Sequence, residues 1–527
     1  MSVEEIKEDL KDACNIADDD VKELDEIYMV FKKSGLDSED FQNRFVAWRL
    51  NAKEYKSIDG VSSEMIRRFE SFLKANMDKK KSTNQSKFAT PKRGRDGTPL
   101  KGKGQLMTPR AKVQKLEYVL DSPASATFKD RRDSGKIIAT LGGDIQPTMS
   151  DEIEIENLID TKSYKLLSFD RRHIADEIAY FINERCEFIE NRLGIVEQAS
   201  YSIITDVPIT VCGMIICEGS KGAEGVYLLR DGEQVQLEIS ELEGNSIFPG
   251  MICAVEGVNL TGKLIVVSKI YQLTDKAIED EGVKEDTTVV ICSGPYFTSD
   301  NTSNEPLEEL ITQVASLAPH LAIFMGPFLD QSHMGADCIS VENLNELWKK
   351  QIDSLAQSGT KVRMIPSTAD LFADPVIPTR AIDEKEFAYC REHMVSNPCF
   401  LAANKWNIAA ISVDLPLSLM KTEIVKNPSN SCKFSRIGEH LLSQQCMMPL
   451  FPAPEEISVD YSKFKENICF EKQPNVLVVR SELNPFIKLV GNTIFINPGK
   501  LTKGKGGGSY ATIQLNSSGH RAKIQKL

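Results

Sequence analysis

Six short apolar runs alternate with helical segments through residues 285–527, and this alternation limits the fold more than any other feature of the chain. Each run is apolar along nearly its whole length, which is typical of strands covered on both faces. Segments between them, such as 306–318 and 341–358, carry apolar residues at helical spacing. The pattern predicts an α/β domain whose sheet faces are covered. The predicted strands are 287–292, 321–325, 361–365, 408–413, 476–479 and 493–496, with a final antiparallel strand over 509–515.

Residues 160–275 predict one helix followed by a small β-barrel. Apolar positions recur at helical spacing from Ala175 to Leu193. Short strands at close spacing, separated by glycine-rich turns, indicate a barrel, for which the OB-fold is the natural candidate. The strand-like runs are 207–217, 225–239, 251–258 and 263–273.

Single-stranded DNA binding is the first function to consider for such a barrel. It requires a basic groove with aromatic side chains on which bases stack. Tyr227 and Tyr271 are the main aromatic residues of these strands. Acidic residues are more frequent, namely Glu218, Glu224, Asp231, Glu233, Glu238 and Glu241. The composition favours a barrel that packs on another domain, with single-strand binding as the alternative.

Residues 1–78 predict a small α-helical bundle. Apolar residues recur at helical spacing, and the breaks at Ser34-Gly35 and Asp59-Gly60 carry residues that cap helices. We interpret this bundle as a partner-docking module, and a folded cap without a partner is the alternative.

Residues 79–150 differ sharply in composition. Between Lys79 and Tyr118 there are twelve Lys or Arg but only two acidic residues, Asp96 and Glu117. Such a basic segment, poor in apolar residues, buries too little surface to offset its ordering entropy, so we expect a disordered tether. We interpret Lys92, Arg93 and Arg95 as a nuclear import signal. Non-specific contact with nucleic-acid phosphates is the rival interpretation, and the two are compatible.

Four Ser/Thr-Pro pairs also lie in this predicted tether. Proline-directed kinases act on exposed extended segments, and proline favours that conformation in the residue before it. Phosphate groups there would cancel much of the local positive charge. The candidate phosphorylation sites are Thr90, Thr98, Thr108 and Ser122.

The whole chain has 527 residues and a formal net charge of −13, which argues for two or three domains and against a surface that coats nucleic acid. Its twelve cysteines include no CxxC pair, the amino terminus is unlike a signal peptide, and no apolar run is long enough to span a bilayer. We therefore expect reduced cysteines in cytosol or nucleus.

The strand ends of the predicted α/β domain resemble the calcineurin-like metallophosphoesterase family. That family binds two metal ions, about 3.5–4 Å apart, through Asp, His and Asn ligands. Here its four motifs fall at 293–295, 326–330, 366–370 and 497–500, where Pro, Ser, Thr and Gly replace ligands. The resemblance implies an inactive site with no catalytic, metal or cofactor residue. The vestigial positions are Ser293, Pro327, Asp330, Asp370 and Asn497.

Two further patterns are weaker. None of the six histidines is paired at metal-ligand spacing. Residues 499–505 fit the GxxxxGK part of a phosphate-binding loop, but Gly506 follows instead of the Ser or Thr that would bind Mg²⁺. A glycine run and a β-like segment come next, so a structural loop is the better interpretation.

An OB-fold joined to a ligand-stripped phosphoesterase domain resembles the B subunits of eukaryotic replicative DNA polymerases. Several strings are similar in particular to the alpha polymerase's B subunit, and the B subunits of the delta and epsilon polymerases are the alternative. These strings are 246–251, 256–262, 293–299, 326–330, 433–437, 481–483 and 497–504.

The resemblance implies a non-catalytic nuclear subunit. Its OB and phosphoesterase domains would bind the C-terminal domain of the catalytic polymerase subunit, and through it primase. The amino-terminal domain would recruit replication-fork factors, DNA would be contacted at most indirectly, and no membrane is involved. The enzymatic alternative is an active phosphoesterase with an unusual metal set.

Overall fold

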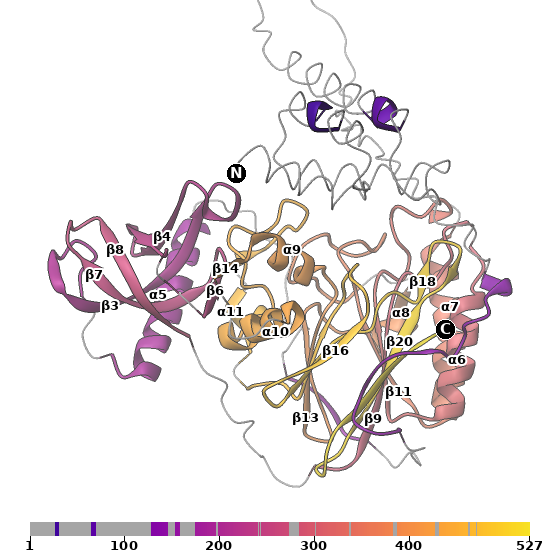
Figure 1. Ribbon diagram of the computed structural model, residues 1–527. Coiled ribbons are helices and arrows are strands. Elements are labelled where there is room, and N and C mark those ends of the chain that lie inside the picture. The colour runs from indigo at the N-terminus through magenta and orange to yellow at the C-terminus, as the bar shows by residue number, and fades with distance from the viewer. Residues whose placement is uncertain are drawn as a thin grey trace, which may run out of the picture. The chain divides into compact units, whose positions relative to one another are not determined.

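The computed structural model divides the chain into two compact units, Met1–Glu117 and Tyr118–Leu527 (Figure 1). The described residues are 27–30, 65–69, 128–145, 153–158, 174–195, 199–240, 242, 244–272, 284–300, 302–336, 339–382, 387–426, 432–461, 464–470 and 472–527. None of the described helices is long and apolar enough to cross a membrane.

The first unit is described at residues 27–30 and 65–69, both helical. Their buried apolar side chains are Ile27, Val30, Met65, Ile66 and Phe69. The rest of the predicted helical bundle lies outside the described residues, as does the basic part of the predicted tether. The import signal at Lys92, Arg93 and Arg95 and the sites Thr90, Thr98, Thr108 and Ser122 lie outside them too.

The predicted barrel is present in the second unit. Its five strands close in the order β3-β4-β5-β8-β7, with only β5 and β8 parallel. Asp231 and Gly232 both have positive φ and make a tight turn, which splits the predicted strand 225–239 into β4 and β5. The strands are β3 (Thr205–Glu218), β4 (Gly225–Arg230), β5 (Glu233–Glu238), β7 (Ile252–Asn259) and β8 (Leu264–Tyr271).

The predicted helix is α5 (Ile174–Leu193), which packs on the outside of the barrel. Ile182, Cys186 and Ile189 form its buried stripe, at the three- and four-residue spacing of one helix face. They contact β3 and β7 through Met214 and Ile252, among others.

Two six-stranded sheets form the α/β domain and face each other (Figure 1). Ile291 and Ile323 from the first sheet pack in one core with Ile408 and Val478 from the second. The first sheet contains β1 (Ile137–Leu141), β21 (Arg521–Lys526), β20 (Ser509–Leu515), β9 (Thr287–Ser293), β10 (Leu321–Met325) and β11 (Lys361–Ile365), in that order. The second contains β16 (Phe486–Val490), β17 (Thr493–Asn497), β15 (Val476–Val479), β13 (Trp406–Ile411), β12 (Cys399–Ala403) and β2 (Ile155–Asn157).

Helices cover the outer faces of both sheets. The first sheet is covered by α6 (Glu305–Leu317) and α7 (Val341–Gln357), and the second by α9 (Leu415–Thr422) and α10 (Lys433–Gln444) (Figure 1). Every central strand is therefore buried on both sides, which explains its continuous apolar sequence. Two facing mixed sheets between helices confirm the predicted α/β domain with covered sheet faces. The smaller elements are η1 (Phe128–Asp130), η2 (Ser220–Gly222), β6 (Asn245–Ile247), α8 (Ala388–Arg391), β14 (Ile424–Lys426), α11 (Phe464–Ile468), β18 (Thr502–Lys503) and β19 (Gly506–Gly507).

The prediction of a disordered tether up to residue 150 is wrong for 128–145. Phe128 is buried, Arg131 Nε donates to Leu527 O at 3.0 Å, and β1 pairs with β21. The partner of β1 lies at the far end of the chain, so local composition carried no sign of it. The predicted final strand, β20, is antiparallel as expected, but it lies inside the sheet, between β9 and β21.

The barrel and the α/β domain share one hydrophobic core. Strand β6 lies in the chain between barrel strands β5 and β7, and it pairs antiparallel with β14 of the α/β domain. The Gln444 amide donates to Ile252 O at 3.0 Å and accepts from Ile252 N at 2.9 Å, in the manner of a strand pair. These contacts join the two domains through backbone groups as well as side chains.

Candidate functional site

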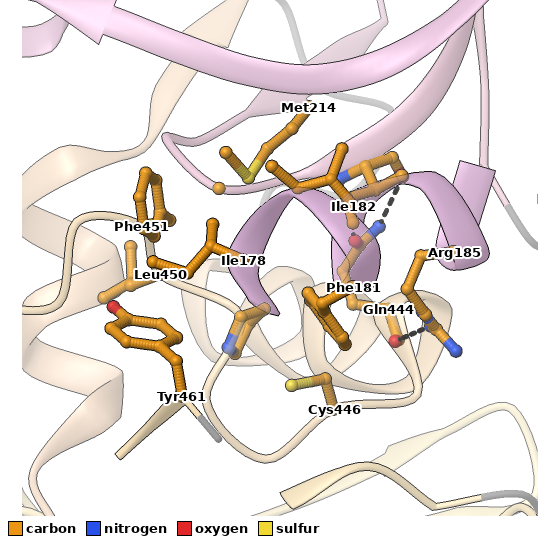
Figure 2. A pocket seen from close by; sticks show the side chains of 13 residues that line it. Ile178, Phe181, Ile182, Arg185, Met214, Gln444, Cys446, Leu450, Phe451 and Tyr461 are labelled. Carbon is orange, nitrogen blue, oxygen red and sulfur yellow. Dashed lines mark hydrogen bonds between the residues drawn. The ribbon is translucent and has the colours of Figure 1, made fainter. Parts of the chain in front are cut away.

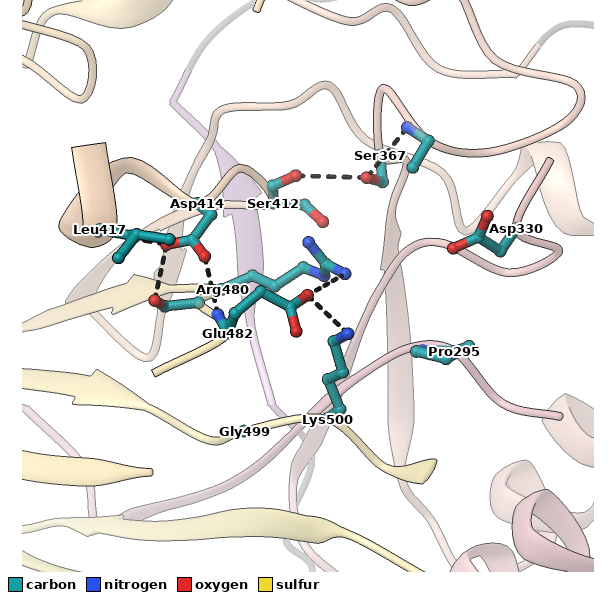
Figure 3. Close-up of polar contacts among 12 residues, drawn as sticks. Pro295, Asp330, Ser367, Ser412, Asp414, Leu417, Arg480, Glu482, Gly499 and Lys500 are labelled. Carbon is teal, nitrogen blue, oxygen red and sulfur yellow. Dashed lines mark hydrogen bonds and ion pairs between the residues drawn. The ribbon is translucent and has the colours of Figure 1, made fainter. Parts of the chain in front are cut away.

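Loops from both sheets meet where the parallel strands of the α/β domain end (Figure 3). Ser293 ends β9, Pro327 follows β10, Ser367 follows β11 and Asn497 ends β17. Since parallel strands bring their carboxyl ends to one edge, the predicted vestigial positions gather there.

Asp370 holds two of these loops together. Its Oδ1 accepts the backbone N–H groups of Phe328 and Leu329, and its Oδ2 accepts that of Ser367 at 2.7 Å. The side chain is almost completely buried, and this burial raises its pKa to about 7 against the opposing effect of the three N–H donors. Gly326 is required beside it, because a Cβ there would lie 2.3 Å from Asp370 Oδ2. Both oxygens are therefore used by the backbone.

Asp330 bonds within its own loop. Its Oδ1 accepts Ser332 N at 2.8 Å and Ser332 Oγ at 2.6 Å. The backbones of Asp330 and Asp370 form an isolated antiparallel bridge. The two carboxylates thus come from paired segments, but each is held by loop donors.

Asn497 is also committed to loop structure. Its Oδ1 accepts Gly499 N at 3.1 Å and Ser481 N at 3.3 Å, and its Nδ2 donates to Leu483 O at 3.1 Å. Pro327 has no donor or acceptor on its side chain. Ser293 is fully buried, and its Oγ has no hydrogen-bond partner within the described part of the chain.

Sequence reasoning missed Ser412, which connects the two sheets. Its Oγ donates to Gly326 O at 2.9 Å, and its carbonyl accepts Ser367 Oγ at 3.3 Å. Asn397 Oδ1 accepts Ser412 N at 2.8 Å. Its position in the sequence could have indicated this role. Ser412 lies directly after β13, just as Ser293 and Ser367 lie at the ends of their strands.

A small charged cluster lies beside these loops (Figure 3). Glu482 pairs with Lys500 at 2.5 Å and with Arg480 at 3.5 Å. Asp414 caps α9 by accepting Leu417 N at 3.2 Å and also accepts Glu482 N at 2.8 Å. Within the cluster, Glu482 is paired with two cations, whereas Asp414 accepts hydrogen bonds from uncharged groups.

The described residues contain no group of three or more His, Cys, Asp or Glu that could hold a metal ion. His320 Nδ1 accepts Thr288 N at 3.0 Å, and His333 Nε2 contacts Thr298 O at 2.9 Å, so both belong to loop structure. The described strand-end side chains thus fix the loops through hydrogen bonds.

The phosphate-loop-like sequence 499–505 leads into the hairpin of β18 and β19, and no helix follows it. Thr502 Oγ1 donates towards Pro295 O and Phe297 O, each at 2.8 Å. The predicted β-like segment is present as β20, where a phosphate-binding loop would continue into a helix.

The barrel's two aromatic residues are engaged by charged neighbours. Tyr271 Oη donates to Glu256 Oε2 at 2.6 Å, and Lys269 Nζ lies 4.4 Å from the ring centre. The charge of Glu218 raises the pKa of Tyr227. A base would have to displace Lys269 to stack on that face of Tyr271.

Comparison with known families matches both domains. A family that comprises the B subunits of DNA polymerases alpha and epsilon matches residues 289–488, and the family of the OB domain of the DNA polymerase alpha B subunit matches residues 176–273. The fold and these matches define the class, which is the B subunits of replicative DNA polymerases.

Individual relatives narrow the class. The B subunit of DNA polymerase alpha from Caenorhabditis elegans is 28% identical over 95% of this chain and 93% of the relative. The mouse protein of the same name is 28% identical over 78% of this chain and 70% of the mouse chain. The rat protein is 30% identical over 67% of this chain and 62% of the rat chain. This chain belongs to the family of DNA polymerase alpha B subunits, whose members act in DNA replication.

Among solved structures, Vps29 of Entamoeba histolytica aligns with 46% of this chain and 92% of its own, at 10% identity and a TM-score of 0.22. An alignment this weak has no bearing on the function of the chain.

Proposed function

We propose that the chain is a non-catalytic accessory subunit of the DNA polymerase alpha–primase complex. The barrel and the α/β domain together bind the C-terminal domain of the catalytic subunit, and that contact links polymerase to primase. The amino-terminal module recruits replication-fork factors. Names of the relatives and the alpha-specific barrel match support the alpha complex over the delta and epsilon alternatives.

One observation carries the non-catalytic part of this proposal. Asp330, Asp370 and Asn497 accept hydrogen bonds from the strand-end loops, and both oxygens of Asp370 accept backbone N–H groups. A two-metal phosphoesterase needs carboxylate and imidazole groups that are free to bind cations. A partner-binding role instead requires a rigid surface, and the shared core with the β6–β14 pairing supplies one.

A hydrolysis assay tests catalytic silence. Purified full chain should cleave phosphodiester substrates no faster than buffer with Mg²⁺, Mn²⁺ or Zn²⁺. The same ions should leave its melting temperature unchanged, because a folded-state metal site would raise it. Metal-dependent cleavage that disappears in Asp330→Ala would overturn the proposal.

Assembly tests the scaffold role. The cut belongs before residue 118, because Phe128 and β1 are part of the second unit. Residues 118–527 should co-purify with the catalytic subunit's C-terminal domain, while deletion of residues 1–117 should impair recruitment to the fork. Loss of the catalytic subunit on gel filtration, from a truncated chain whose circular dichroism is native, would contradict this division of labour.

Nuclear localisation by residues 79–118 is part of the same proposal. Replacing Lys92, Arg93 and Arg95 with Ala should raise the cytoplasmic fraction of the chain expressed without its catalytic subunit. Unchanged nuclear accumulation would remove the import assignment and leave the scaffold role untouched.

A further inference from the structure

Cys446 and Cys469 face each other across an antiparallel bridge on the barrel side of the α/β domain. The hydrogen bonds flank the pair: Met447 N donates to Ile468 O at 2.9 Å, and Phe470 N donates to Gln445 O at 3.0 Å. This pattern makes the two cysteines a non-hydrogen-bonded pair, the type in which opposite Cα atoms lie only about 4.5 Å apart. Disulfides span Cα separations of about 4.4–6.8 Å. The backbone is therefore already placed for a bond between the two sulfurs.

The two thiols differ in access. Cys446 is buried and lines an apolar cavity beside Phe181 and Ile178 of α5 (Figure 2). Cys469 is half-buried and lines a groove of about 780 Å³, whose wall also includes Phe188, Phe400 and Lys472. A small reagent can therefore reach Cys469 from the groove, whereas Cys446 is buried beside it.

We propose that Cys446 and Cys469 form a reversible disulfide by thiol–disulfide exchange with a low-molecular-weight disulfide of the glutathione class. Cys469, as the thiolate, attacks one sulfur of the reagent and releases the first glutathione thiolate. Cys446 then loses its proton to solvent and attacks the Cys469 sulfur of the mixed disulfide, which releases the second glutathione thiolate. Both released thiolates take up the protons lost by the cysteines. The protein loses two hydrogens, and one glutathione disulfide becomes two glutathione molecules.

The surroundings agree with this order. Burial raises the pKa of Cys446 well above its ordinary value, and a hydrogen bond with Cys469 adds to the shift. Cys446 is therefore a poor first nucleophile, but it lies beside the mixed disulfide once that has formed, and proximity favours its attack. In a reducing compartment the pair is a dithiol, and the bond forms when the glutathione pool becomes more oxidised.

Other cysteines show that strand register decides the pairing. Cys212 and Cys253 lie on the neighbouring strands β3 and β7, but Cys212 is opposite Ala254 and Cys253 is opposite Gly213. Their side chains point to different faces, since adjacent residues alternate along a strand. Closing a bond there would require a shift of the strands.

The bond would tie the segment after α10 to the segment after α11. The first of these segments contributes Leu450 and Phe451 to the cavity against α5 (Figure 2). Oxidation would therefore stiffen the α/β side of the junction with the barrel and, as a cross-link, stabilise the fold.

The test treats the folded full chain with glutathione disulfide, alkylates remaining thiols with iodoacetamide, and maps peptides by mass spectrometry without reduction. A peptide pair joined through Cys446 and Cys469, two hydrogens lighter than its reduced form, is expected. Dithiothreitol should reverse it. The oxidised chain should melt about 3–5 °C higher than the reduced chain.

Variants distinguish a disulfide between Cys446 and Cys469 from general oxidation of thiols. Cys469→Ser should abolish the cross-link and the rise in melting temperature, and Cys469→Ala should do the same. The matched control is Cys432→Ser, since Cys432 is also half-buried, directly precedes the same helix α10, and has a lowered pKa. It should retain the cross-link fully.

Three results would overturn the proposal. They are quantitative alkylation of both cysteines after oxidation, a glutathione adduct on Cys469 that does not resolve, and a cross-link that joins other cysteines. Native circular dichroism of the treated protein ensures that each result refers to the folded state.

Discussion

Asp370 and Glu423 are two carboxylates buried to the same extent, each 4% exposed, in different regions of the second unit. Asp370 lies among the strand-end loops and is held by backbone N–H groups alone. Glu423 lies at the junction with the barrel, where Arg436 Nε and Nη2 each donate to it at 3.0 Å and His440 Nε2 contacts it at 3.1 Å. His440 also contacts Ser246 of the barrel at 3.0 Å.

The partners decide the charge that each carboxyl prefers. Burial raises the pKa of Asp370 to about 7, because neutral donors compensate the lost hydration only in part. Burial also acts to raise the pKa of Glu423, but the hydrogen bonds and charges of His440 and Arg436 outweigh it and lower the pKa to about 2. The strand-end region thus tolerates a neutral carboxyl, whereas the junction requires an anion.

The largest effect should come from removing the cation at the junction. Arg436→Met leaves Glu423 buried without its main partner, which should cost about 3–5 kcal/mol of unfolding free energy in urea titration. As a matched control, Lys350→Met breaks the exposed pair with Glu308, 72% and 46% exposed, and should cost less than about 1 kcal/mol. Equal losses of unfolding free energy in the two variants would show that burial does not make the Arg436–Glu423 pair stronger than the exposed pair.

A double variant sharpens this result. Arg436→Met with Glu423→Gln removes both charges, so it should recover much of the stability lost by Arg436→Met alone. No recovery would mean that the guanidinium contributes through packing instead of charge.

Asp370→Asn should have an intermediate effect. An amide turns one N–H group towards the three backbone donors, which should cost about 1–3 kcal/mol. Because the folded-state pKa of Asp370 is raised, the wild-type contribution is fully present below about pH 4 and is lost as pH rises through about 7. The difference in stability between variant and wild type should therefore narrow from about pH 4 to about pH 7.

The control, at a single pH, is Asp330→Asn in the neighbouring loop. Its amide oxygen can still accept the two hydrogen bonds from Ser332, so this variant should cost less stability than Asp370→Asn. If the difference in unfolding free energy between Asp370→Asn and wild type stayed constant with pH, this result would contradict a raised pKa of Asp370. Glu423 should act in the opposite direction, since its contribution is present above about pH 4.5 and is lost towards pH 2.

These two regions also differ in how far the sequence could predict them. The strand ends followed from continuous apolar runs such as 321–325 and 476–479, because a strand buried on both faces leaves an unbroken local signal. The role of the polar residues at those strand ends could not be predicted. Asp370 was expected as an isolated carboxylate, and its three backbone donors come from loops that meet only in the folded chain.

The contacts at the junction could not be predicted from the sequence, although the strings 246–251 and 433–437 carry the family resemblance. Glu423, Arg436 and Ser246 are ordinary polar residues in sequence, and β6 and β14 are three-residue strands from distant parts of the chain. The same reason explains why β1 was not predicted, since its partner β21 lies at the opposite end of the chain. Local periodicity indicates that a residue is buried, but it does not indicate which segment of the chain covers that residue.

The smallest effect should come from the charged cluster beside the strand-end loops. Lys500 and Glu482 are paired at 2.5 Å, but their side chains are 28% and 49% exposed, so water and salt screen the attraction. Lys500→Met should lower the unfolding free energy by less than about 1 kcal/mol, and the loss should shrink further in about 1 M salt. Arg436→Met should keep its cost at the same salt concentration, because its buried pair is screened far less. A large, salt-independent loss for Lys500→Met would show that the loops depend on this pair, and that the strand-end region is held by charge as the junction is.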